Sequence, residues 1–146
     1  MHPHQRRIRH ATVSQRIPAW FGLVILSAAI GGCAATPLQP GAERVIVARQ
    51  APPKSCKFVG AVVGAQGGII SGRYTSNQNL AEGALNDVRN RAHALGANYV
   101  SIQSETAGQT GSGSSFDGTG NYYSAQTDVT KTGNAYSCPP KDIGLQ

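Results

Sequence analysis

The segment from Leu80 to Leu95 constrains the fold most, because its apolar residues recur at spacings of three and four. This period places them on one helical face, within roughly 140° of arc. They are Leu80, Ala84, Leu85, Val88, Ala92 and Leu95. Ser76 and Asn77 precede the segment as candidate N-caps, and Gly96 follows where helices often end in the left-handed conformation. A helix with one apolar face needs a second layer to cover it.

Short aliphatic and β-branched runs predict the strands of that second layer. They are residues 43–49, 56–65, 98–103, 123–129 and 135–138. Gly60 and Gly64 interrupt the second run and mark a bulge or a close backbone approach. Residues 107–121 are rich in Gly, Ser and Thr, so we expect a long flexible hairpin loop there. The sequence predicts an α+β fold, with one helix packed on a small, mainly antiparallel sheet.

The N-terminal 32 residues have the pattern of a secretory signal peptide. Four arginines lie in the first 16 residues, and 12 uncharged residues from Ala19 to Ile30 follow them. Gly31 and Gly32 then supply small residues for cleavage. The apolar run is shorter than the ~20 residues that a membrane-spanning helix needs. We therefore expect residues 1–32 to be removed.

The residues Ile30-Gly31-Gly32-Cys33 resemble the lipobox of bacterial lipoproteins. In that family the cysteine thiol receives a diacylglyceryl group, the chain is cut just before the cysteine, and further acylation follows. The resemblance implies that Cys33 carries lipid, palmitate included, and that Ala34 after it directs the protein to the outer membrane, facing the periplasm. Several acyl chains hold a protein firmly, whereas one binds only marginally.

Two other interpretations of this segment stay open. Cys33 could be an ordinary cysteine behind an ordinary secretory signal. Alternatively, the uncharged stretch from Ile17 to Ala42 could be an uncleaved membrane anchor. The position of the cysteine directly after two glycines, at the end of the apolar run, favours the lipoprotein interpretation.

Removal of the signal peptide changes the charge of the chain. The formal charge is +6 over 146 residues, but from Cys33 onward nine Lys or Arg face seven Asp or Glu, which leaves about +2. No basic stripe survives, so no nucleic-acid partner is expected. The mature part divides into a short tether with two prolines (33–42), a single domain (43–140) and a C-terminal tail (141–146).

Cys56 and Cys138 remain to pair once Cys33 is lipidated. An even pair in an oxidising compartment predicts a single disulfide, worth about 4–5 kcal/mol in the chain-entropy model. A metal or redox pair is the alternative, although the chain has no Cys-x-x-Cys and keeps only His93 after cleavage.

The helix and its surroundings resemble an uncharacterised family of small Gram-negative outer-membrane lipoproteins. The resemblance covers roughly residues 36–140. It rests on Asn79-Leu80, on residues 84–90 and 95–100, and on the flanking residues 56–60 and 133–139. Residues 95–98, Leu-Gly-Ala-Asn, and the strand after them are also similar to the outer-membrane lipoprotein that senses envelope stress for the Rcs phosphorelay (RcsF). These motifs encode a helix end and a strand, so they imply fold more than function.

Groups for catalysis are sparse. Gly67 to Tyr74 faintly resembles a phosphate-binding loop, but Arg73 and Tyr74 stand where Lys and Ser or Thr are required. His93 falls on the polar helix face, where a solvated histidine is expected. No Gly-x-Ser-x-Gly is present, and the carboxylates are scattered along the chain. We expect no catalytic, cofactor-binding or metal-binding residues, and no enzyme.

Two functions remain as expectations. The first is a membrane-anchored, non-enzymatic protein-interaction module of the envelope, with stress sensing as the role that the Rcs resemblance suggests. The second is a structural or ligand-binding module for peptidoglycan or lipopolysaccharide. The chain's tyrosines could serve it by lining a glycan-binding face, or could pack within the sheet; they are Tyr74, Tyr99, Tyr122, Tyr123 and Tyr136.

Overall fold

The computed structural model describes residues 34–116 and 119–145. The expected signal peptide and Cys33 lie outside the described residues. The elements, in chain order, are η2 (Ala42–Arg44), β1 (Ile46–Ala48), β2 (Lys57–Gly67), η3 (Ser71–Tyr74), α2 (Asn77–Ala94), β3 (Tyr99–Phe116), β4 (Thr119–Ser137) and η4 (Pro140–Ile143). Within these two ranges, every helix is too short or too polar to span a bilayer.

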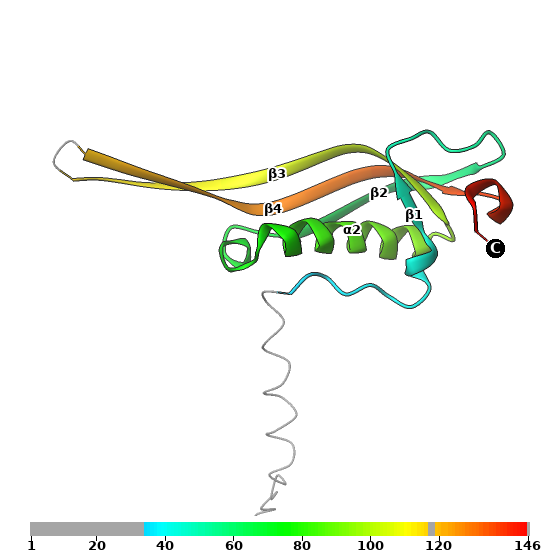
Figure 1. The fold of residues 1–146 in the computed structure, drawn as a ribbon, viewed down its shortest axis with the longest axis horizontal. Coiled ribbons are helices and arrows are strands. Elements are labelled where there is room, and N and C mark those ends of the chain that lie inside the picture. Colours follow the sequence, from blue (N-terminus) through cyan, green and yellow to red (C-terminus); the bar gives the residue numbers. More distant parts are fainter. Residues whose placement is uncertain (1–33, 117–118, 146) are drawn as a thin grey trace, which may run out of the picture. The chain divides into compact units, whose positions relative to one another are not determined.

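The four strands form one mixed sheet in the order β1-β3-β4-β2. β1 runs parallel to β3, whereas the β3–β4 and β4–β2 pairs are antiparallel. The parallel pair is possible because β2 and α2 lie between β1 and β3 in the chain and provide the long crossover that it needs. Helix α2 packs on one face of the sheet (Figure 1). The expected α+β fold is confirmed.

Helix α2 begins three residues earlier than the apolar pattern predicts. Ser76 is the N-cap, and its hydroxyl accepts a hydrogen bond from the amide of Asn79 at 3.1 Å. At the other end Gly96 has φ +74°, and the Ala97 amide donates back to the carbonyl of Ala92 at 2.9 Å. Leu95 lies past the last helical turn, and this explains why it stays 48% exposed despite its place in the apolar pattern.

The core lies between α2 and the sheet. Its main cluster consists of Val45, Val62, Val88, Ala92, Ala97, Val100 and Ala135, and a smaller one of Leu80, Ala84 and Val129. A Cβ on Gly64 would lie 2.5 Å from both the Ala84 carbonyl oxygen and the Val88 nitrogen. Gly64 therefore marks a close backbone approach, and a register shift between Phe58 and Gly60 marks a bulge, the two roles predicted for these glycines.

The disulfide joins Cys56 to Cys138. It connects the residue before β2 to the residue after β4, where Lys57 pairs with Ser137. The link therefore closes the end of an antiparallel pair and ties an edge strand to the middle of the sheet.

The expected loop at residues 107–121 is wrong for the described part of that range. β3 and β4 pair continuously until Phe116 meets Thr119, so the segment is a long β-hairpin. Paired strands satisfy each other's backbone groups without a core, and Gly, Ser and Thr do not prevent this. A Gly-, Ser- and Thr-rich composition therefore excludes a core here but does not exclude a backbone ladder.

Candidate functional site

The far half of the hairpin has no neighbouring strand. β1 pairs with β3 only as far as Ser101, and β2 pairs with β4 only as far as Asp128. Beyond Gly108 on β3 and before Thr127 on β4, the described residues of the two strands pair only with each other. We call residues 109–116 and 119–126 the arm, and residues 34–108 and 127–145 the body. Figure 1 shows the arm continuing past the N-terminal end of α2.

The base of the arm is firmly held. The register shifts between Gly108 and Gln109, opposite Thr127, whose side chain is buried. The Thr127 carbonyl accepts a hydrogen bond from the amide of Gly68 at 2.9 Å, and its hydroxyl lies 3.1 Å from that of Thr110. Gly72 packs so closely on this carbonyl that an added Cβ would lie 1.7 Å from the oxygen. The arm thus leaves the body from a rigid junction.

The arm has no charged residue and no proline among its 16 described positions, 109–116 and 119–126. Natural proteins normally protect exposed strand edges with charges, prolines or a covering segment. A lone two-stranded hairpin is at best marginally stable in water. The arm therefore presents two long backbone edges that another strand can complete.

Two exposed tyrosines lie on the arm. Tyr122 is 73% exposed and Tyr123 is 72% exposed. Successive strand residues point to opposite faces, so the Tyr122 and Tyr123 rings lie on opposite faces of the arm. Tyr122 lies across the opposite strand, where a Cβ on Gly111 would lie 1.9 Å from its hydroxyl oxygen. Gly111 makes room for this ring.

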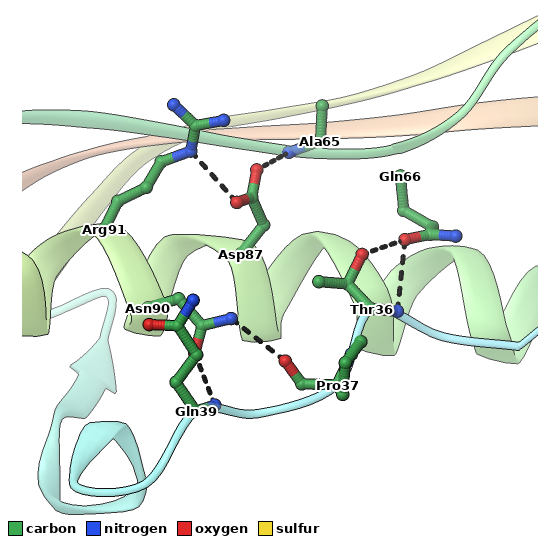
Figure 2. A network of polar contacts seen from close by, with 8 residues as sticks. All are labelled: Thr36, Pro37, Gln39, Ala65, Gln66, Asp87, Asn90 and Arg91. Carbon is green, nitrogen blue, oxygen red and sulfur yellow. Dashed lines mark hydrogen bonds and ion pairs between the residues drawn. The ribbon is translucent and has the colours of Figure 1, made fainter. Parts of the chain in front are cut away.

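A second polar site holds the N-terminal segment, residues 34–41, which we call the strap. Asn86 and Asn90 lie four residues apart on α2 and are 8% and 7% exposed. The Asn86 amide donates to the carbonyl of Thr36 at 2.9 Å. Asn90 donates to the carbonyl of Pro37 at 3.0 Å and accepts from the amide of Gln39 at 2.8 Å (Figure 2). The helix is therefore covered on two sides, by the sheet and by the strap.

Gln66 of β2 fixes the start of the strap. Its side-chain oxygen accepts from the amide and hydroxyl of Thr36, and its nitrogen donates to the carbonyl of Ala34 at 3.3 Å. Gly83 of α2 lets this side chain pass, because a Cβ there would lie 2.5 Å from the Gln66 oxygen. The residues expected to form a tether are thus bound to the body from Ala34 onward. The contacts of Asn86 and Asn90 with the strap were not predicted from the sequence, where both residues look like solvated polar side chains.

The edge of β2 is covered at one point by the helix. The Asp87 carboxylate accepts from the backbone amide of Ala65 at 3.0 Å and from the Arg91 guanidinium at 3.0 Å (Figure 2). A side chain thus satisfies an outward-facing amide of this edge strand, the protection that the arm lacks.

His93, expected on the polar face of the helix, is exposed at the C-terminal end of α2. Its ring lies against Gly41, beside a hollow of about 470 Å³ that Glu43, Arg44 and Asn98 also line. The hollow has no cysteine or serine in its lining. In the described part of the chain, no three His, Cys, Asp or Glu side chains gather where they could hold a metal.

An ion cluster links β3 and β4 to the residue after β1. Glu105 lies 2.6 Å from the Lys131 ammonium and 3.0 Å from the Arg49 guanidinium. The hydrogen bond from Lys131, with the charges of both cations, lowers the pKa of Glu105, although partial burial opposes the shift. The cluster lies beside Val47 and Ile102 and braces the body rather than forming a reactive site.

Residues 36–138 match a family model described as "Domain of unknown function (DUF4156)". The chain is 29% identical over 120 residues to "Uncharacterized protein YjeI" of Escherichia coli (strain K12), covering 81% of this chain and 93% of that protein. The proteins of that name from Escherichia coli O6:H1 and Shigella flexneri match equally well. No solved structure matches significantly. The matched range, from the strap residue Thr36 to Cys138, covers well over half of the chain. This chain therefore belongs to the DUF4156 family.

Proposed function

We propose that the protein is a lipid-anchored lipoprotein of the outer membrane that acts as a non-enzymatic protein-interaction module in the periplasm. The arm carries the proposal, because it combines two unpaired edges, no charged residue at its described positions and a hydrogen-bonded base. The signal-peptide pattern and the lipobox-like residues before Cys33 support the location.

The geometry favours strand addition as the binding mode. In this mode an extended segment of a partner pairs with an exposed edge, and main-chain hydrogen bonds supply the affinity. Either edge of the arm offers eight described residues for such pairing, longer than a typical strand. The partner is therefore an envelope protein with an extended, uncharged segment. The Rcs resemblance of residues 95–98 gives stress sensing as the role that such binding would serve.

In-cell crosslinking of the anchored protein, followed by mass spectrometry, tests this proposal. The wild type is expected to capture one dominant envelope protein. A Ser112→Lys, Tyr123→Lys variant, with charge on both strands of the arm, is expected to lose it, as is a Cys33→Ala control. Retained capture by the arm variant would contradict the assignment to the arm.

A second candidate is a module that binds peptidoglycan or lipopolysaccharide. The observation that favours it is the pair of exposed rings, Tyr122 and Tyr123, because aromatic faces offer apolar contact area with a polar end. Sedimentation with purified cell wall separates the two functions. Retention that a Tyr122→Ala, Tyr123→Ala variant abolishes would favour the second over the first.

A further inference from the structure

The segment between β2 and α2 carries the most exposed aliphatic side chains in the described chain. In residues 68–75, which we call the loop, Ile69 is 71% exposed, Ile70 is 80% exposed and Tyr74 is 74% exposed. Arg73 lies beside Tyr74 and is also exposed. Adjacent large apolar residues that remain in solvent usually mark a contact surface. The core of the body does not cover these side chains, so any surface that covers them lies outside the body.

The exposure is built into the structure of the loop. The Gly68 amide donates to the carbonyl of Thr127 at 2.9 Å, and the Gly72 amide donates to the carbonyl of Gly68 at 2.8 Å. The Thr75 hydroxyl closes the turn on the carbonyl of Ser71 at 2.9 Å. The two isoleucines are therefore held on the outside by a hydrogen-bonded turn.

The chain that leads to Cys33 meets the body beside this loop. Gln66, two residues before Gly68, donates a hydrogen bond to the carbonyl of Ala34. Ala34 is joined directly to Cys33, and consecutive Cα atoms are about 3.8 Å apart. A lipid on Cys33 would therefore enter the bilayer close to Ile69 and Ile70, within the length of a few residues.

We infer that the loop inserts into the surface of the bilayer that holds Cys33, an inference that rests on the proposed lipid anchor. Ile69 and Ile70 have the chemistry of the acyl boundary. Tyr74 suits the headgroup level, where its ring is apolar and its hydroxyl is wet, and Arg73 suits lipid phosphate. The lipid and the loop form two points of attachment, which set the orientation of the body and hence the direction of the arm.

The fluorescence of a single introduced tryptophan can report on this contact. Its single tryptophan, Trp20, lies before Cys33, so the mature protein has none. We would place one indole in the loop (Ile70→Trp) or, as the matched control, on the equally exposed arm (Tyr122→Trp). Ile69→Trp gives a second loop reporter. Each full-length variant is processed in cells, purified and reconstituted into phosphatidylethanolamine–phosphatidylglycerol vesicles, with or without brominated acyl chains.

The expected result is at least twofold bromine quenching and a blue-shifted emission for both loop variants, with little change for Tyr122→Trp. Vesicle flotation and the mass of the Cys33 peptide are measured on the same samples. Acylated protein that floats without quenching in the loop variants overturns the loop contact and leaves the anchor standing. Protein that neither carries acyl chains nor floats overturns both.

Discussion

The body and the arm share the same two strands but differ in everything that surrounds them. In the body, β4 has β2 along its outer edge and β3 has β1 as far as Ser101, with a helix on one face and a disulfide at the end. In the arm, the described residues have only the cross-strand ladder. The difference indicates that the body supplies most of the stability of the fold, and it supports our proposal that the arm contacts a partner. Changes in the body should therefore affect stability while leaving the arm's binding intact, provided the body still folds.

The largest effect is expected from loss of the disulfide. A Cys56→Ala, Cys138→Ala variant should lose roughly 4 kcal/mol of unfolding free energy, because the unfolded chain gains the freedom of a loop with a sequence separation of 82. Urea denaturation under non-reducing conditions measures this loss. A variant as stable as the wild type would show that the packing of the body does not need the link.

Overpacking of the helix–sheet contact should come next. Gly64→Val places a side chain against the backbone of α2 and should cost about 3 kcal/mol. The matched change in the arm is Gly113→Val, where the nearest atom to a Cβ is a Tyr122 ring carbon at 3.4 Å. That variant should stay within about 0.5 kcal/mol of the wild type. Equal losses in the two regions would show that the arm is packed as tightly as the body.

Release of the strap should have a smaller effect. Asn90→Ala leaves the Pro37 carbonyl and the Gln39 amide without their side-chain partner and should cost roughly 2 kcal/mol. Gln78→Ala, at an exposed position of the same helix, is the control and should change stability little. Hydrogen exchange at the Gln39 amide should accelerate only in Asn90→Ala; an unchanged rate would mean that the strap is held by other contacts.

The smallest effect concerns pH. Because the folded-state pKa of Glu105 is lowered, its ion pairs stabilise the fold above the ordinary glutamate pKa of about 4.3, and this contribution disappears as the pH falls through the folded value. Glu105→Gln should therefore lower the free energy of unfolding by less than about 1 kcal/mol at pH 7. At a pH below both the folded-state and the ordinary pKa of Glu105, the substitution should cost nothing. Stability curves of the two proteins that stay parallel through the acid range would contradict the assignment.

Much of the body could be predicted from the sequence, because its elements leave local signals. The spacing of Leu80, Ala84 and Val88 predicts the helix face, and Gly96 predicts its end. The disulfide followed from the count of cysteines. These signals arise from burial and backbone geometry, which act within a few residues along the chain.

The strap and the arm could not be predicted in the same way. Asn86 and Asn90 look like solvated polar residues in the sequence, because an amide that binds water and one that binds a distant backbone are chemically identical. The glycines and serines of the arm form no sequence pattern that predicts a buried core or a turn. Their strand conformation comes from the pairing of two backbones, which extends the β3–β4 ladder of the body past a register shift between Gly108 and Gln109.

The most direct test of the central claim is site-specific photocrosslinking in living cells. A photoreactive residue is placed at Ser112 on the arm or, as the control, at Ala61 on the exposed side of β2. We expect Ser112 to capture one dominant envelope protein and Ala61 to capture none. Capture from Ala61 with none from Ser112 would contradict the claim that the arm is the binding surface.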